Sequence, residues 1–401
     1  MSKKKVVLAY SGGLDTSVMI KWIQEQYDAD VVSCILDVGQ GKKLKEVEEK
    51  AWKLGVVNHY SIDAKKEFVD EYCFQALKAN ALYMDTYPVS SSLSRPLISK
   101  YLVEVAGKED AWAAAHGCTG KGNDQVRFDI TIKAHNPDLK IIAPVREWNM
   151  GREEEILWAK EHGVPVPVTV NSPYSIDQNL WGRSIESGIL EYPEEMAPDD
   201  IWEWTAHIKD TPDEPEYITI GFQAGVPVSL NGEEMDSVKL VETVKDAAGR
   251  HGIGRVEHME DRIVGLKSRE TYEVPAAEVL IEAHKDLEKM VLTRHQKLFK
   301  MKVDQEWSFL TYAGLWVDPL MDDLNAYIDK SQENVTGEVK MKLYNGKASP
   351  VARSSKYSLY DINLTSFDIN TEYNQKDAVG FINLWGLPSV TAWALKRKAQ
   401  G

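Results

Sequence analysis

The first segment with chemical potential is a glycine-rich stretch near the start of the chain, Tyr10-Ser-Gly-Gly-Leu-Asp-Thr-Ser17. Consecutive glycines let backbone N–H groups turn toward one point, which makes an anion-binding nest. The hydroxyls of Ser11, Thr16 and Ser17 add donors, and a helix that begins here adds positive potential. The segment is neither GxGxxG nor GxxxxGK[ST], because no lysine follows the glycines. A plain tight turn with Asp15 or Thr16 as the N-cap is the alternative.

A second such segment is Ala115-His-Gly-Cys-Thr-Gly-Lys-Gly-Asn-Asp-Gln-Val-Arg-Phe128. A helix that opens with Asn123 and Asp124 could hold an amino group with its carboxylate. Arg127, one helical turn further on, could hold a carboxylate of a second substrate. The pattern therefore predicts a pocket for zwitterionic ligands, with a solvated loop ahead of a helix as the alternative.

The cysteine in this second segment, Cys118, raises the possibility of a nucleophile. A nucleophilic cysteine needs a base or a positive field. His116 is two residues away, but the surrounding glycines suit backbone contact with a nucleotide better. Cys118 with Cys34 and Cys73 makes an odd number without CxxC spacing. We therefore expect neither a disulfide framework nor a metal site.

Strand-like and helix-like patterns alternate over the first 165 residues. Short apolar runs alternate with segments of helical spacing, which predicts right-handed crossovers and a parallel sheet. A loop at the carboxyl end of the first strand of such a sheet is where nucleotides bind. The predicted strands cover 6–10, 31–36, 56–62, 111–115 and 140–143, and the predicted helices cover 16–27, 43–54, 65–80 and 152–162.

The pattern changes near residue 165. The prolines of Val164-Pro-Val-Pro-Val168 do not suit a central strand, so this segment marks a boundary. Beyond it, the hairpin signals Asn231-Gly232 and Asn345-Gly346, with a helical segment over 276–295, predict an α+β domain with mainly antiparallel pairing.

The last segment, 377–398, is strongly apolar, so we expect it to pack on another subunit or on its own domain. The expected domains are a nucleotide-binding domain over 1–168, an α+β domain over 169–366 and a C-terminal helical tail over 367–401.

The composition excludes several classes of protein. The 401 residues are 43% hydrophobic and 27% charged, as in ordinary globular proteins. The net charge of −15 argues against nucleic-acid binding. No apolar run approaches the roughly 18 residues of a membrane helix, and the N-terminal run is too short for a signal peptide. We expect a cytoplasmic protein that binds neither nucleic acid nor membrane.

The motifs resemble those of a known family. SGGxD[ST] after a first strand is similar to the PP-loop of the ATP pyrophosphatases, which cleave ATP between the α and β phosphates. HGCTGKGNDQVRF resembles the signature of the argininosuccinate synthases, and the stretches 92–97, 172–186 and 265–273 agree with it. Gln178, Asp129 and Ser94 depart from the residues usual there, but none is an assigned ligand contact.

The resemblance implies an α/β fold with an adenine nucleotide alpha hydrolase-like PP-loop domain, followed by an α+β synthetase and multimerisation domain and a C-terminal oligomerisation tail. It also implies a particular reaction. ATP, L-citrulline and L-aspartate would give AMP, pyrophosphate and argininosuccinate through a citrullyl-adenylate, a step of arginine biosynthesis. Magnesium would accompany ATP, no covalent enzyme intermediate would form, and the assembly would be a homotetramer.

The resemblance also assigns residues. Asp124 would orient the attacking ammonium group, and Ser11 would stabilise the departing pyrophosphate. Three residues would hold aspartate: Thr119, Asn123 and Asp124. ATP would be surrounded by Ala9, Tyr10, Ser11, Gly12, Gly13, Leu14, Asp15, Thr16, Ser17, Leu36, Ala115, His116, Gly117, Cys118, Thr119, Gly120, Lys121, Gly122 and Asn123. Citrulline would be met by Tyr87, Ser92, Asn123, Arg127, Ser175, Ser184, Glu260 and Tyr272.

Two other functions use the same nucleotide domain. A tRNA-thiolating or amide-forming enzyme would need paired reactive cysteines with a basic face, or an amidotransferase domain, and the sequence offers none of these. A nucleotide sensor without catalysis would bind ATP but release no citrulline-dependent pyrophosphate, and it leaves the motifs of the second half unexplained.

Overall fold

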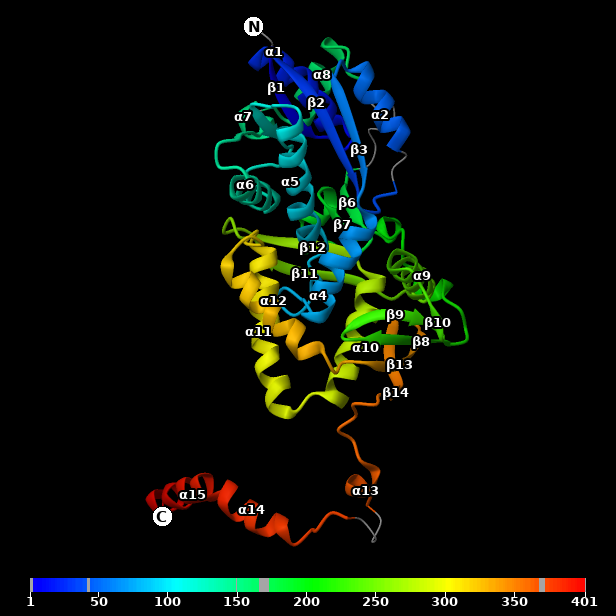
Figure 1. Ribbon diagram of the computed structural model, residues 1–401, viewed down its shortest axis with the longest axis vertical. Coiled ribbons are helices and arrows are strands. Elements are labelled where there is room, and N and C mark those ends of the chain that lie inside the picture. Colours follow the sequence, from blue (N-terminus) through cyan, green and yellow to red (C-terminus); the bar gives the residue numbers. More distant parts are fainter. Residues whose placement is uncertain (1–2, 42–43, 149, 166–172, 368–371, 401) are drawn as a thin grey trace. The chain divides into compact units, whose positions relative to one another are not determined.

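The computed structural model describes residues 3–41, 44–148, 150–165, 173–367 and 372–400 (Figure 1). The chain divides into two compact units, residues 1–357 and residues 358–401.

Unit 1 begins with a parallel sheet of five strands in the order β3-β2-β1-β4-β5. The chain moves outward from β1 to β3 and then returns to the other side of β1, so the strand order reverses between β1 and β4. This topology confirms the predicted parallel α/β domain. The strands are β1 (Lys4–Ala9), β2 (Ala29–Asp37), β3 (Asn58–Asp63), β4 (Ala113–Ala115) and β5 (Lys140–Ile142).

Helices cover both faces of this sheet. Successive side chains of a strand point to opposite faces. Val6 and Leu8 pack in one core with α1 (Leu14–Tyr27), whereas Val7 packs in another core with α5 (Ser90–Lys108). Burial on both faces explains why these strands read as continuous apolar runs. Four further helices of this half are α2 (Leu44–Lys53), α6 (Asp124–His135), α7 (Pro144–Glu147) and α8 (Arg152–Glu161).

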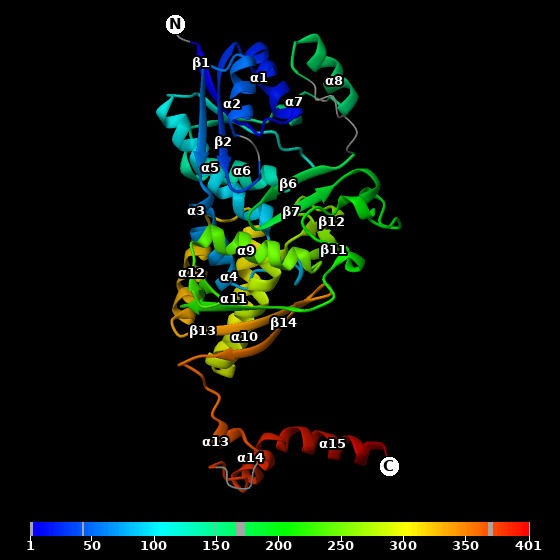
Figure 2. The same ribbon diagram turned by 90° about the vertical axis from the view of Figure 1, so that its right-hand side faces the viewer.

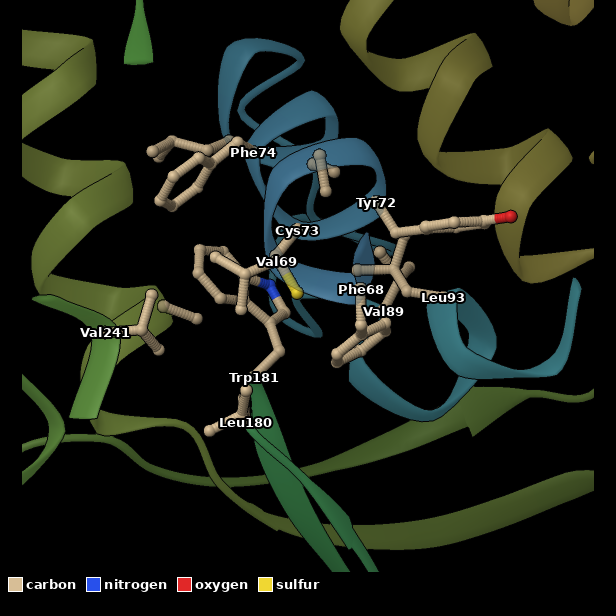
Figure 3. Close-up of a cluster of buried hydrophobic side chains, with 14 of the residues drawn as sticks. Phe68, Val69, Tyr72, Cys73, Phe74, Val89, Leu93, Leu180, Trp181 and Val241 are labelled. Carbon is tan, nitrogen blue, oxygen red and sulfur yellow. The ribbon is translucent and has the colours of Figure 1, made fainter. Parts of the chain in front are cut away.

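The segment predicted as a single helix over 65–80 is helical, but it is divided into three pieces. A π-helical segment interrupts it. Phe68 of this segment and Phe74, the first residue of the next helical piece, belong to one core with Trp181 and Val241 from later in the chain (Figure 3). The half of unit 1 that contains the parallel sheet therefore shares its larger core with the second half. The three pieces are α3 (Lys65–Glu67), η1 (Phe68–Cys73) and α4 (Phe74–Lys78).

The second half of unit 1 contains two antiparallel sheets, as predicted. Their orders are β10-β9-β8-β13-β14 and β11-β12-β7-β6. Asn231-Gly232 joins β9 to β10, and Asn345-Gly346 joins β13 to β14, both with positive φ. The strands are β6 (Ser175–Asn179), β7 (Gly182–Glu186), β8 (Glu216–Gln223), β9 (Val226–Leu230), β10 (Glu233–Glu234), β11 (Arg255–Asp261), β12 (Lys267–Glu273), β13 (Gly337–Tyr344) and β14 (Lys347–Ser354).

The predicted helix over 276–295 is wrong at its carboxyl end. The helix α10 (Pro275–Val291) stops before Thr293, and a new helix, α11 (Arg294–Tyr312), begins after it. Thr293 and Gln296 form a reciprocal capping box, in which each side chain accepts a hydrogen bond from the other residue's backbone N–H. Two further helices are α9 (Ser237–Arg250) and α12 (Pro319–Gln332). Figure 2 gives a second view of these helices and sheets.

Unit 2 is helical, with α13 (Ile362–Thr365), α14 (Asp377–Trp385) and α15 (Leu387–Gln400). Large apolar side chains such as Trp385 and Trp393 are exposed in the single chain. No single helix in the described ranges is long and apolar enough to cross a membrane, although α14 and α15, bent by 52°, pass this test as a pair.

The predicted domain limits stay predictions. The boundary between 168 and 169 lies outside the described residues, and the tail predicted over 367–401 includes five more residues without a description.

Candidate active site

The two predicted nucleotide loops lie beside each other at the carboxyl edge of the parallel sheet. Residues 10–13 connect β1 to α1, and residues 116–123 connect β4 to α6. The strands β1 and β4 are paired, with Leu8 opposite Ala115. The crevice outside a point of strand-order reversal is where open α/β sheets bind ligands.

The first loop is a turn that requires glycine. Gly12 has φ of +74°, and a Cβ there would meet Val47 at 3.0 Å. The Gly13 N–H donates to Ser11 Oγ at 3.3 Å, and the hydroxyls of Ser11 and Thr16 are 3.2 Å apart. Ser11 is exposed, and Thr16 is partly so. These groups form the outer surface of the turn, where an anion would bind.

Other predicted residues of this loop face inward. The Ser17 hydroxyl donates to the Gly13 carbonyl at 2.6 Å and lies 3.3 Å from the Tyr10 hydroxyl. The side chain of Leu14 is in the core. The Leu36 carbonyl accepts a hydrogen bond from Gln40 at 2.6 Å. These residues shape the loop and its neighbouring strand, and the side chains of Tyr10, Leu14 and Ser17 are too buried to reach a nucleotide in this conformation.

A buried histidine anchors the second loop. His116 Nδ1 accepts from the Cys118 N–H at 3.2 Å, so Nε2 carries the proton that is donated to Asp129 at 2.7 Å. Asp129 also accepts from Arg146 at 2.8 Å. Burial raises the pKa of the Cys118 thiol far above its ordinary value, so the thiolate that a nucleophile requires is disfavoured. Thr119, Gly120 and Lys121 are exposed at the tip of the loop.

Asp124 opens α6 and is held between two arginines. Arg95 Nη2 donates to Asp124 Oδ2 at 2.7 Å, and Arg127 Nη1 donates to Asp124 Oδ1 at 2.7 Å. Burial opposes ionisation of this carboxyl, but the positive charges of Arg95 and Arg127 outweigh it and hold the pKa of Asp124 well below its usual range. Asp124 is therefore a permanent negative charge and a poor proton acceptor near neutral pH.

Arg95 has a site role that the sequence reasoning missed. It also donates to Asp177 Oδ2 at 2.5 Å, so it links α5, α6 and β6. Arg95 stood in a recognised motif, but no role was assigned to it because its partners lie far away in the sequence. The pair of arginines balances the pair of aspartates, which keeps this partly buried cluster neutral.

The predicted citrulline residues of the second half share one face of a sheet. Directly opposed residues of antiparallel strands point to the same side. Ser184 of β7 is opposite both Asp177 of β6 and Tyr272 of β12, and Ser175 is opposite Glu186. This face, with α5 packed on it through β6 and β7, faces the nucleotide-binding half.

An aromatic and carboxylate cluster occupies this face. Tyr87 stacks on Tyr272 with ring centroids 4.1 Å apart. The Tyr272 hydroxyl donates to Glu260 Oε2 at 2.8 Å. Ser92 is buried in α5, and its hydroxyl has no hydrogen-bond partner among the described residues. The structure thus brings Tyr87, Glu260 and Tyr272 into contact, whereas Ser175 is exposed at the start of β6.

Two further carboxylates at the edge of this face were not predicted. Arg262 Nη2 contacts both Glu270 at 2.8 Å and Glu186 at 3.2 Å. Burial and the negative charge of Glu270 raise the pKa of Glu186 to about 7. Glu186 can therefore exchange a proton near neutral pH, which Asp124 cannot.

Asn123 lies at the N-cap of α6, and both the nitrogen and the oxygen of its side-chain amide form hydrogen bonds. Its Nδ2 donates to the Tyr312 hydroxyl at 2.8 Å, and its Oδ1 accepts from the Ile263 N–H at 2.9 Å. The turn that contains Ile263 joins β11 to β12, so this turn contacts the end of the second nucleotide loop. Tyr312 ends α11 and belongs to no motif that the sequence analysis used.

The fold and the site together define a class of protein. A glycine turn and a second loop flank the point of strand reversal, and the second loop continues into a helix that reaches a polar sheet face. This arrangement defines a nucleotide-binding α/β domain joined to a second domain with a polar sheet face.

The particular family follows from comparisons with known proteins. Residues 5–165 match the family described as "Arginosuccinate synthase N-terminal HUP domain", and residues 174–392 match "Arginosuccinate synthase C-terminal domain". The argininosuccinate synthase of Symbiobacterium thermophilum is 54% identical over 401 residues, which is 100% of both chains. That of Bacillus thuringiensis is 54% identical and covers 97% of both. The chain belongs to the argininosuccinate synthase family.

A solved structure shares much less. A U34-tRNA thiolase from Methanococcus maripaludis is 17% identical and covers 41% of this chain and 60% of that chain, with a TM-score of 0.28. A similarity this low supports no inference about function.

Proposed function

We propose that this chain joins citrulline to aspartate, with ATP converted to AMP and pyrophosphate. The observation that carries the proposal is the position of α6. Its first turn ends the second nucleotide loop and, through Asp124 and Arg95, is bonded to Asp177 on the polar sheet face. ATP bound at the loops and an amino acid bound on this face would then meet at one place.

The first step adenylates citrulline. The ureido oxygen attacks the α-phosphorus of ATP, the bond to the β-phosphate breaks, and pyrophosphate leaves. The loop amides near Gly12 and Gly13 and the Ser11 hydroxyl would stabilise the negative charge that develops on the departing group. Orientation of the two substrates supplies much of the rate acceleration.

The second step forms the new C–N bond. The amine of aspartate attacks the ureido carbon, and AMP leaves with the former ureido oxygen. Thr119, Asn123 and Asp124 would bind aspartate, and the fixed negative charge of Asp124 orients its ammonium group. The citrulline residues are Tyr87, Ser92, Asn123, Arg127, Ser175, Ser184, Glu260 and Tyr272.

Magnesium would enter with the phosphates of ATP. Among the side chains that the structure describes, no three His, Cys, Asp or Glu residues lie close enough together to hold a metal ion. A homotetramer and a cytoplasmic location complete the proposal, and the exposed apolar helices of unit 2 support the assembly.

The test uses citrulline labelled with heavy oxygen in the ureido group. The purified protein receives ATP, magnesium, labelled citrulline and aspartate, and the AMP is analysed by mass spectrometry. We expect one heavy oxygen in each AMP. Unlabelled AMP, or ADP as the nucleotide product, would exclude the proposed chemistry.

A further inference from the structure

Three predicted substrate-binding residues meet at Tyr312, the last residue of α11. Its hydroxyl accepts from Asn123 Nδ2 at 2.8 Å and donates to Glu260 Oε1. Its carbonyl accepts from Arg127 through Nε at 3.0 Å and Nη2 at 2.8 Å. Its ring stacks on Tyr83 with centroids 3.5 Å apart. The side chain is buried, so these contacts are made out of bulk water.

The donors and acceptors at Tyr312 admit one arrangement. Glu260 is an acceptor when ionised, so the single hydroxyl proton goes to it, and the oxygen is left to accept from Asn123. The Asn123 amide is fixed in the same sense, because its Oδ1 accepts from the Ile263 N–H. Burial and the negative charge of Glu260 raise the pKa of Tyr312 far above its ordinary value, so the hydroxyl remains a donor at any working pH.

The hydroxyl therefore connects two halves of the site. Asn123 belongs to the nucleotide loop, whereas Glu260 lies on the polar sheet face. A buried chain of hydrogen bonds is strengthened by mutual polarisation, so the two ends of such a chain are energetically coupled. Loss of the hydroxyl would leave Asn123 with an unused, partly buried donor and would deprive Glu260 of one donor, although Tyr272 would still donate to the other oxygen of Glu260.

We infer that Tyr312 is a positioning residue, which acts through Asn123, Arg127 and Glu260 to set the citrulline subsite against the nucleotide loop. The inference rests on the proposed function, since it uses the citrulline subsite named there. The hydroxyl and the carbonyl of Tyr312 are bonded to these three residues, so Tyr312 would act through them.

The first test replaces only the hydroxyl, in Tyr312→Phe. The ring contacts and the backbone carbonyl remain, so the fold should be retained, which thermal unfolding checks. We expect the KM for citrulline to rise about tenfold, and the KM for ATP to change less than twofold. An unchanged KM for citrulline, or equal increases for both substrates, would overturn the inference. Tyr327→Phe, on α12 against Phe299, is the matched control and should change neither.

The second test measures coupling. Citrulline binding is followed by calorimetry, without turnover, in Tyr312→Phe, Glu260→Gln and the double variant. If Tyr312 acts through Glu260, its hydroxyl matters less once Glu260 is changed, so the double variant should lose less affinity than the product of the two single losses. Strictly multiplicative losses would contradict the inference.

Two different results would contradict the proposed function and the inference about Tyr312. If the unmodified protein transfers no citrulline oxygen to AMP, the proposed function is wrong. If it does so and Tyr312→Phe behaves like the unmodified protein, only the inference about Tyr312 is wrong.

Discussion

At the residue scale, the central group is Asp124, a carboxylate whose charge is fixed by two arginines. A base must accept a proton near the working pH, and the neighbouring charges of Arg95 and Arg127 prevent this. A carboxylate that stays ionised is instead suited to orient an ammonium group. The same two arginines compete for its oxygens, so binding of aspartate must rearrange part of this network or use the remaining lone pairs.

Asp124→Asn tests this role. The amide keeps the shape but loses the charge, so we expect the KM for aspartate to rise on the order of 10- to 100-fold. The KM for ATP should change by less than about threefold, because the phosphate loop is untouched. Steady-state kinetics with each substrate varied in turn gives both values, and the exposed Asp138→Asn is the matched control. Equal increases for aspartate and ATP would count against the assignment.

The sequence predicts part of this network and misses part, for a physical reason. Asn123, Asp124 and Arg127 lie within one helical turn, so their proximity can be read from spacing. Arg95 reaches Asp124 and Asp177 only through the fold, across sequence separations of 29 and 82. No local pattern contains such contacts.

At the element scale, the contact between the starts of α1 and α8 contains a shared charge cluster. Arg152 Nη1 donates to Asp15 at 2.5 Å and lies 3.1 Å from Glu155. Glu155 is buried, and its Oε1 has no hydrogen-bond partner among the described residues. Burial and the charge of Asp15 raise the pKa of Glu155 from 4.5 to about 7.

The raised pKa of Glu155 makes the stability of the folded protein depend on pH. Between pH 4.5 and about 7 the folded state holds a proton on Glu155 that the unfolded chain releases. The free energy of unfolding therefore falls as pH rises through this window, by about 3 kcal/mol from this group. Denaturant unfolding at pH 5 and pH 8 should show a smaller fall in Glu155→Gln than in the unmodified protein. The exposed Glu153→Gln should behave as the unmodified protein, and an identical fall in Glu155→Gln would contradict the prediction.

The sequence predicts helices and strands correctly where buried apolar residues recur at the regular spacing of that structure. The strands β1 and β2 are buried on both faces and apolar over most of their length, and they were found. The hairpins β6–β7 and β11–β12 were missed because their site-facing residues are serine, aspartate, glutamate and tyrosine, which hides the alternation of apolar and polar residues. The helix α5 was missed because it opens with three serines and contains Pro96. The elements that carry the site are thus the hardest to find from sequence.

At the scale of the whole molecule, unit 2 exposes more apolar surface than a free tail should. Trp385 and Trp393 are 68% and 61% exposed, and the apolar residues around them on α14 and α15 are similarly bare. A chain that ends at Tyr357 should therefore form a smaller assembly than the full-length protein, which sedimentation velocity measures directly. A full-length variant with Leu384→Glu and Trp393→Glu should show the same decrease. An unchanged assembly in both would show that unit 2 does not hold the subunits together.

The central claim, that the loop near Gly12 binds the outer phosphates while citrulline attacks the inner one, is tested most directly by a crystal structure. The protein would be crystallised with citrulline and an ATP analogue in which a methylene group replaces the α,β-bridging oxygen. We predict that the β- and γ-phosphates lie against the amides of Gly12 and Gly13, with the ureido oxygen about 3 to 3.5 Å from the α-phosphorus. Phosphates bound away from this turn, or a ureido group pointing away from the α-phosphorus, would contradict the account.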